Sequence, residues 1–213
     1  MSSRRYPGKV LAPFRGEPLI RHVIRAVEAV LPAQEIVLAT SSHPTDDALA
    51  RYVESVGVQV WRGPLDNVLD RYVQCLGDHP CEWVLRINGA SPLLFAELVR
   101  LIVRYGDHFA GDLVTTIAPR TFPRGQNAEL INAAALKAMA TEELTTEDRE
   151  HVTPYFYRHP ERYRIENIES GAPKLADASL AVDTIDDLYR LERMSAEDLR
   201  QLTPPILMEA AAT

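Results

Sequence analysis

The stretch that decides the fold is residues 35–61, which read EIVLATSSHPTDDALARYVESVGVQVW. Residues 35–40 form a short, almost continuous apolar run, which is typical of a strand buried on both faces of a parallel sheet. A helix with an acidic first turn is expected from Thr45, its N-cap, and Gly57 ends it. Residues 58–61 then predict a second strand. A strand, a helix and a strand in this order favour a right-handed parallel crossover.

The same alternation extends over the rest of the chain. Apolar residues recur every three or four positions in residues 18–31, which predicts an amphipathic helix that Pro32 ends. Further helices are expected at 65–76, 95–105, 132–143, within 146–158 and at 183–194, and further strands at 83–87, 112–116, 128–131, 163–168 and 180–182. We therefore expect an α/β fold of three layers, with a mostly parallel sheet and helices on both faces.

Length and charge limit the class of protein. The 213 residues suit one domain, expected over residues 1–203, and the Pro-Pro and small residues of 204–213 predict a frayed tail. A formal net charge of −7 argues against a nucleic-acid partner, which needs clustered cations over a wide face. No apolar run is long enough for a membrane span and no signal peptide is recognisable, so we expect a cytoplasmic protein without a membrane partner.

Charged side chains follow several of the expected strands, where ligands bind in open parallel sheets. Residues 1–9 form a cationic loop with a Pro-Gly turn, here called the first loop. Such a loop can bring backbone N–H groups and an ammonium group onto a phosphate. Several cations and a carboxylate around one crevice suit a nucleoside triphosphate with bound Mg²⁺. For any single arginine, a solvated surface position remains the open alternative. An NAD-dependent oxidoreductase is disfavoured because no Gly-x-Gly-x-x-Gly follows an expected strand.

Six short motifs occur in one order over most of the chain. They are Ser3-x-Arg5-x-Pro7-Gly8-Lys9, Arg62-Gly63 with Asp66-Asn67-Val68-Leu69-Asp70-Arg71-Tyr72, Arg86-x-x-Gly89-x-x-Pro92-Leu93, Phe122-Pro123-Arg124-Gly125, Arg149-Glu150-His151-Val152-Thr153-Pro154-Tyr155 and Val182-Asp183-Thr184. Each motif alone is weak, but six in order are specific. Together they resemble the spore coat polysaccharide biosynthesis protein F-like branch of the cytidylyltransferases, which is similar to the synthetases of CMP-activated sugar acids.

The resemblance implies a nucleotide-diphospho-sugar transferase-like fold and a homodimer. It implies transfer of CMP from CTP to a sugar acid or related acceptor, with pyrophosphate release, in surface polysaccharide or secondary-metabolite biosynthesis. The residues it implies for catalysis are Lys9, Arg5, Arg86 and Asp183. Those it implies for nucleotide binding are Ser3, Arg5, Lys9, Asp66, Asp70 and Arg86, and those for the acceptor are Arg124, Glu129 and His151. Asp183 would hold Mg²⁺.

Three acidic positions of the family pattern are neutral in this chain. Ala90 stands where the family has an Asp that is the other metal ligand, and a methyl group cannot coordinate Mg²⁺. Asn127 replaces a carboxylate, and Phe95 stands where an Asp is common. The alternative function is therefore a catalytically impaired paralogue that binds a nucleotide or a partner protein.

The start of the chain departs from the family as well. Family members begin with an apolar strand followed by Gln-Ala-Arg-Met-Gly-Ser, and Met1 here falls on the Met of that phrase. The first central strand is therefore expected to be missing, which would leave its two neighbours with unpaired backbone groups. Either the start codon was assigned late or the fold has been rebuilt.

Overall fold

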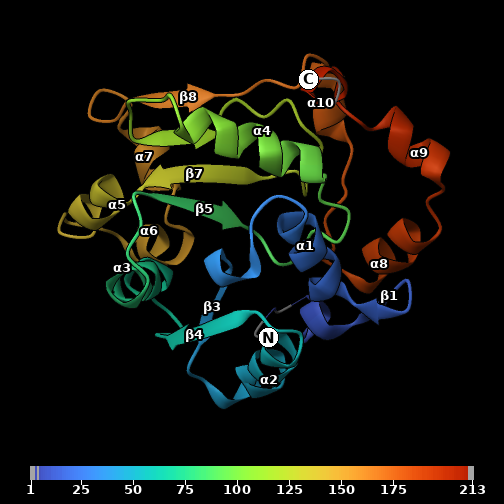
Figure 1. Cartoon of the computed structure of the whole chain (residues 1–213), viewed down its shortest axis with the longest axis horizontal. Coiled ribbons are helices and arrows are strands. Elements are labelled where there is room, and N and C mark those ends of the chain that lie inside the picture. The colour runs from blue at the N-terminus through green and yellow to red at the C-terminus, as the bar shows by residue number, and fades with distance from the viewer. Residues whose placement is uncertain (1–2, 4, 211–213) are drawn as a thin grey trace.

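The computed structural model describes residue 3 and residues 5–210, and its larger sheet has four strands (Figure 1). They lie in the order β5 (Trp83–Ile87), β7 (Ala128–Asn132), β6 (Leu113–Thr115) and β8 (Ile165–Asn167). β7 is antiparallel to both of its neighbours, whereas β6 and β8 are parallel. All strands of this sheet except β7 therefore run in one direction.

A second, separate sheet pairs β3 (Val37–Ser41) in parallel with β4 (Gln59–Gly63), the two strands predicted within residues 35–61. Among the described residues, β3 pairs only with β4 and β5 pairs only with β7. Each of β3 and β5 thus keeps one edge without a strand partner in this part of the chain.

A small hairpin was not expected from the sequence. β1 (Pro13–Phe14) and β2 (Glu17–Pro18) pair antiparallel around Arg15 and Gly16, both of which have positive φ, 48° and 87°. Two central residues with positive φ are the feature of a type I′ turn, which suits the twist of a tight hairpin. Strands of two residues are too short to show a periodic pattern.

Ten α-helices and four short 3₁₀ turns complete the described part of the chain. The α-helices are α1 (Leu19–Glu28), α2 (Asp47–Ser55), α3 (Val68–Asp78), α4 (Ala96–Gly106), α5 (Ala133–Met139), α6 (Thr146–His151), α7 (Pro154–Arg158), α8 (Ile185–Glu192), α9 (Ala196–Gln201) and α10 (Pro205–Ala210). The 3₁₀ turns are Lys9–Leu11, Ala33–Glu35, Pro44–Asp46 and Pro173–Asp177.

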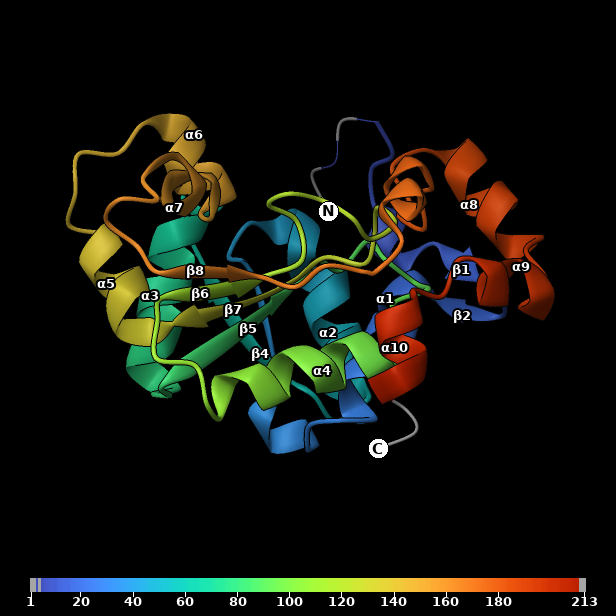
Figure 2. The same cartoon turned by 90° about the horizontal axis from the view of Figure 1, so that it is seen from above.

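Helices cover both faces of the larger sheet (Figure 2). α4 packs on β6 and β7 from one side, and α6 and α7 lie on the other. Successive side chains of a strand point to opposite faces. Accordingly, Val114 and Leu130 belong to the core under α4, whereas Leu113 and Ile131 belong to the core of α3, α5, α6 and α7. The predicted three-layer α/β fold is confirmed.

The start of α2 differs from the prediction. Thr45 lies within a 3₁₀ turn, and the side chain of His43 accepts a hydrogen bond from the Thr45 backbone N–H. Asp46 is buried and accepts hydrogen bonds from the hydroxyls of Thr40 and Ser41 and from the Ser41 backbone. Burial works to raise the pKa of Asp46, but these hydrogen bonds outweigh it and hold the pKa well below its usual range. Asp46 thus stabilises the end of β3 through these hydrogen bonds and is not an exposed acidic residue in the first turn of the helix.

The region 146–158 is two short helices because the chain turns sharply at Val152. Val152 is fully buried with φ 68° and ψ −72°, and the Thr153 N–H donates to the carbonyl of His151 over 2.9 Å. These angles define the strained form of the γ-turn, which a β-branched residue adopts only when packing imposes it. The turn redirects the chain so that α7 can pack its aromatic residues into the core.

The last described residues form a short helix that packs on the core. α10 packs against α4, and Leu207 is 1% exposed within the core. Pro205 stands at the first position of this helix, where proline is well tolerated. Residues 205–210 are thus helical in the segment for which the sequence predicted a frayed tail, while residues 211–213 lie outside the described part.

Candidate functional site

The site is organised by an extended segment, residues 178–183, that runs between two loops. On one side, the Arg124 N–H donates to Ala178 O over 2.9 Å and the Leu180 N–H donates to Arg124 O over 2.6 Å. On the other, the Val182 N–H donates to Ala90 O over 2.9 Å. The strand predicted at 180–182 is thus an extended segment bonded on both sides. It carries Asp183 to a position between the two loops.

Gly125 allows the loop of residues 120–127, here called the basic loop, to lie directly on this segment. Its φ is +95°, and a Cβ built there would stand 2.7 Å from the backbone of both Leu180 and Ala181. Backbone atoms cannot move aside as a flexible side chain can, so only glycine fits. This close approach fixes the position of the backbone at the neighbouring Arg124.

A cavity of about 730 Å³ opens where these segments meet, which is within the size range of small-ligand sites. Its wall is mostly polar. Its lining includes Arg5, Ala90, Arg120, Arg124, Asn127 and Asp183. The first loop, the 88–91 turn and the basic loop, which are far apart in sequence, therefore contribute to one site.

Asp183 has a cation on each carboxylate oxygen. Lys9 Nζ lies 2.9 Å from Oδ1 and an Arg5 guanidinium nitrogen lies 3.0 Å from Oδ2. Lys9 also donates to Val182 O over 2.6 Å. The hydrogen bond from Lys9 lowers the pKa of Asp183 most, and the charges of Lys9 and Arg5 lower it further against the opposing effect of burial. Three residues predicted for catalysis thus lie in contact.

The fourth predicted catalytic residue, Arg86, belongs to a buried network next to the cavity. Arg86 and Glu129 are directly opposite partners on β5 and β7 and form an ion pair. Glu129 is 1% exposed, and its second oxygen accepts a 2.5 Å hydrogen bond from the Tyr157 hydroxyl, which in turn lies 2.8 Å from Thr115 Oγ1. Burial works to lower the pKa of Arg86, but the charge of Glu129, its hydrogen bond and the neighbouring Tyr72 and Tyr157 together outweigh burial and raise that pKa.

Glu129 was predicted to bind the acceptor, but both of its carboxylate oxygens already interact with Arg86 and Tyr157. Tyr157 and Thr115 were not predicted as site residues. The signal that could have found them is the register of β5, β7 and β6, because position-by-position pairing aligns Arg86, Glu129 and Thr115 across the sheet. A single sequence does not show that register.

The basic loop contributes two guanidinium groups that have no carboxylate partner within the described part of the chain. Arg120 donates to Asn127 Oδ1 over 2.6 Å. For Arg124, which is exposed, the described residues provide no side-chain hydrogen bond or ion pair. Burial, and then the charge of Arg124, lowers the pKa of Arg120. Asn127 therefore holds Arg120 without neutralising it, which leaves this wall attractive to anions.

Seven predicted residues do not line the cavity: Lys9, Arg86 and Glu129, whose contacts are given above, and Ser3, Asp66, Asp70 and His151. Ser3 accepts a 3.4 Å hydrogen bond from the Tyr6 N–H, Asp66 is exposed, and Asp70 accepts from Gln74 in the first turn of α3. His151 is exposed at the end of α6. Their roles in nucleotide or acceptor binding stay predictions.

Phe95 and Gln126 have structural roles that explain their residue types. Phe95 packs against the core and its N–H donates to Gln126 Oε1 over 3.0 Å. Gln126 is fully buried, and its Nε2 donates to Leu93 O over 2.8 Å. Gln126 thus connects the turn before α4 to the basic loop, a role that the sequence alone did not reveal.

Comparison with known proteins identifies the family of this arrangement. The sequence profile of the cytidylyltransferases matches residues 1–205. The chain belongs to the cytidylyltransferase family. It is 32% identical over 203 residues to the spore coat polysaccharide biosynthesis protein SpsF of Bacillus subtilis (strain 168), covering 91% of this chain and 82% of SpsF. It is 28% identical over 174 residues to the 3-deoxy-manno-octulosonate cytidylyltransferase of Bdellovibrio bacteriovorus, covering 80% of this chain and 64% of that one.

Solved structures support the same fold for this cytidylyltransferase family member. A cytidylyltransferase from Leptospira borgpetersenii aligns with a TM-score of 0.86 at 22% identity, covering 100% of this chain and 90% of that one. A CMP:2-keto-3-deoxy-manno-octonic acid synthetase in complex with CTP aligns with a TM-score of 0.67 at 16% identity, covering 94% and 95%. Rv0371c from Mycobacterium tuberculosis, solved in complex with manganese, aligns with a TM-score of 0.62 at 15% identity, covering 91% and 95%.

The residues described here do not provide the Mg²⁺ site that the resemblance implies. Within residues 3 and 5–210, no group of three or more His, Cys, Asp or Glu side chains is arranged to hold a metal ion. Both oxygens of Asp183 face cations, and the nearby cavity wall is the methyl group of Ala90. Mg²⁺ requires hard oxygen ligands in near-octahedral geometry. This donor set does not fit it.

Proposed function

We propose that the protein transfers CMP from CTP to a sugar acid or a related acceptor and releases pyrophosphate, in polysaccharide biosynthesis. The observation that carries the proposal is the cation-rich cavity between the first loop, the 88–91 turn and the basic loop. Preorganised cations facing a transferring phosphoryl group are the main catalytic requirement of this class of reaction. The names of the relatives supply the acceptor class.

Each cluster has a proposed role. Arg5 and Lys9, which share Asp183, bind the triphosphate, and Arg86 contacts the nucleotide from the adjoining network. Arg124 binds the acceptor, since its guanidinium group has no carboxylate partner among the described residues. The buried Glu129 acts through Arg86 as a positioning residue.

The reaction itself is a displacement at phosphorus. The acceptor hydroxyl oxygen attacks the α-phosphorus of CTP and forms a new P–O bond. The bond from that phosphorus to the oxygen bridging the β-phosphate breaks, and pyrophosphate leaves with the electron pair while the hydroxyl proton passes to solvent. Arg5 and Lys9 stabilise the charge that develops on the leaving pyrophosphate. No step is assigned to Mg²⁺, because the donor set does not fit it.

A second candidate function is nucleotide binding without turnover. Two features favour it: the methyl group of Ala90 on the cavity wall and the cations on Asp183. Both leave fewer carboxylate oxygens free to bind a metal ion. Its discriminating property is CTP binding without pyrophosphate release.

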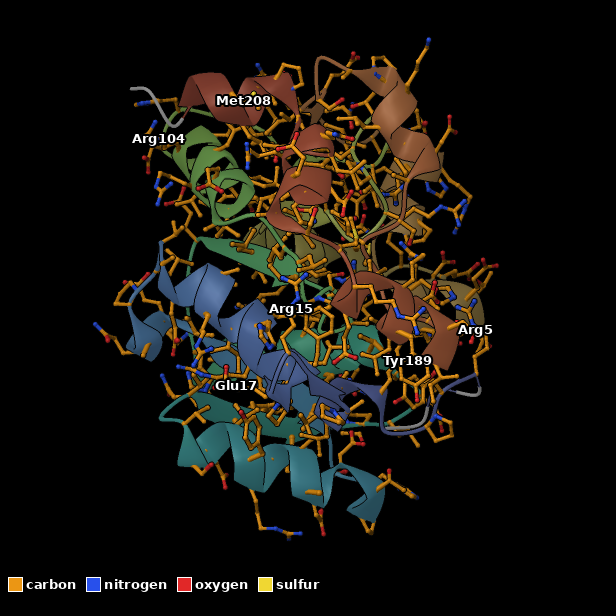
Figure 3. All side chains as sticks on the ribbon, turned by 90° about the vertical axis from the view of Figure 1, so that its right-hand side faces the viewer. Arg5, Arg15, Glu17, Arg104, Tyr189 and Met208 are labelled. Carbon is orange, nitrogen blue, oxygen red and sulfur yellow. The ribbon has the colours of Figure 1, made fainter. Side chains whose placement is uncertain are left out.

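Pyrophosphate release from CTP in the presence of a panel of sugar acids tests the proposal. We expect release that depends on CTP and on one acceptor class, and an Arg124→Gln variant should lose most of it. Arg104→Gln is the matched control, because Arg104 is exposed on α4 and well separated from Arg5 (Figure 3). CTP binding without release for any acceptor would support the second candidate instead.

Assembly and location are part of the same proposal. The homodimer and the cytoplasmic location stay predictions, which size-exclusion chromatography with light scattering and cell fractionation would test. Across the described residues, none of the helices is both long and apolar enough to cross a bilayer.

A further inference from the structure

The charges around the cavity suggest how a nucleotide would be held. Lys9 and Arg5 surround Asp183, so this trio carries a net positive charge. Arg120 and Arg124 add two more cations on the opposite loop. The local excess of positive charge attracts a polyphosphate and disfavours a free divalent cation.

The other carboxylates on the wall, Asp177 and Asp187, reduce this excess without removing it, because four cations (Arg5, Lys9, Arg120 and Arg124) stand against three carboxylates (Asp177, Asp183 and Asp187). Asp187 Oδ2 accepts from the N–H groups of Asp183 and Thr184 and from the Thr184 hydroxyl, which caps α8. Its other oxygen lies 3.4 Å from Arg190. Asp177 is exposed at the end of its 3₁₀ turn.

We infer that the nucleotide enters this crevice as the free anion, with Arg5 and Lys9 supplying the positive charge that a divalent cation would otherwise bring. The inference rests on the proposed function, since it concerns the same triphosphate. Asp183 then serves as a positioning residue that holds the two cations toward the cavity. The free triphosphate carries more negative charge than its magnesium complex, so it gains more from these cations.

Titration calorimetry with CTP, in Mg²⁺ and in EDTA at equal ionic strength, measures the metal dependence directly. We expect the Kd in EDTA to be equal within about threefold, or tighter. Binding that is about tenfold or more weaker in EDTA would overturn the inference. If CTP binds under neither condition, the proposed function and the inference fall together. If pyrophosphate release requires metal and binding does too, only the inference falls.

The Asp183→Asn variant separates a positioning role from a metal-ligand role. A positioning carboxylate predicts that CTP binding weakens by the same factor in EDTA and in Mg²⁺, because the two cations lose their common anchor. A loss seen only in Mg²⁺ would make Asp183 a metal ligand and overturn the inference. Asp107→Asn, an exposed carboxylate at the end of α4, controls for the change in net charge.

The Ala90→Asp variant provides the converse test. A carboxylate on this wall offsets the excess positive charge, so we expect weaker CTP binding in EDTA and recovery of that binding when Mg²⁺ is added. Ala90 is 7% exposed, so the thermal unfolding of the variant is measured first. If the variant does not fold, the Asp183→Asn comparison decides the question alone.

Discussion

Arg86 and Glu129 stand directly opposite each other on adjacent antiparallel strands, and the ion pair between them is buried on the Glu129 side. Removing one partner of a buried pair leaves the other charge without compensation, which costs about 3–5 kcal/mol in fully buried cases. Because the Arg86 side chain keeps 26% exposure, we expect Glu129→Gln to lower the free energy of unfolding by about 2–3 kcal/mol. Urea unfolding measures this change.

The matched control for that variant is Glu142→Gln. Glu142 pairs with Arg162, and both side chains are more than a third exposed, 35% and 43%. Exposed pairs contribute about 0–1 kcal/mol. Equal losses for Glu129→Gln and Glu142→Gln would mean that the Arg86 pair is solvated in solution.

The hydroxyl of Tyr157 makes stability sensitive to alkaline pH. Burial, and then the charge of Glu129, raises the pKa of Tyr157 above its ordinary value of 10.0. Above that pH the unfolded chain loses a proton that the folded protein keeps, so stability falls as pH rises, by about 1.4 kcal/mol per pH unit for this group. We expect Tyr157→Phe to show a shallower decline above pH 10, measured by urea unfolding over a pH series. Tyr189→Phe, at a half-exposed ring on α8, should keep the original slope.

Much of the fold follows from local pattern, as the segment from β3 to β4 illustrates. Its apolar runs and the glycine after α2 mark both strands and the helix within a few residues. The same kind of reasoning was wrong at Thr45, because Asp46 turns inward to bond Thr40 and Ser41. That choice depends on contacts with the end of β3, which propensity does not include.

The candidate site was likewise predictable only in part from the sequence. The motif order assigned Arg5, Lys9 and Asp183 to one site, and in the structure both cations contact Asp183, although Lys9 and Asp183 are 174 positions apart. It did not reveal that both oxygens of Glu129 bind Arg86 and Tyr157, because strand register and side-chain burial decide those contacts. It also treated Phe95 as a lost acid, whereas packing on the core explains an apolar residue there.

The glycine at position 125 is predicted to be indispensable for bringing the basic loop onto residues 178–183. Gly125→Ala adds a methyl group 2.7 Å from backbone atoms as well as positive-φ strain. We expect Gly125→Ala to lower the free energy of unfolding by more than about 3 kcal/mol, since backbone strain alone accounts for about 1–3 kcal/mol. Gly57→Ala is the matched control, because Gly57 has φ +84° and nothing within 4 Å of the added atom. If the two variants unfold at the same urea concentration, the loop does not press on that segment in solution.

Gln126 offers a test of the buried connection between the basic loop and the start of α4. Gln126→Glu keeps the oxygen that accepts from the Phe95 N–H but loses the donor to Leu93 O, unless the new carboxyl is protonated. A carboxyl buried at this fully enclosed position has its pKa above the ordinary range, because burial disfavours its charged form. The variant is therefore expected to approach the stability of the parent protein at acidic pH and to lose stability as pH rises and the unfolded chain ionises. Gln126→Met removes both hydrogen bonds at every pH, so its deficit relative to the parent should stay constant over the same series. Parallel pH profiles for the two variants would show that the Gln126 side chain is reached by water and does not bridge the two loops.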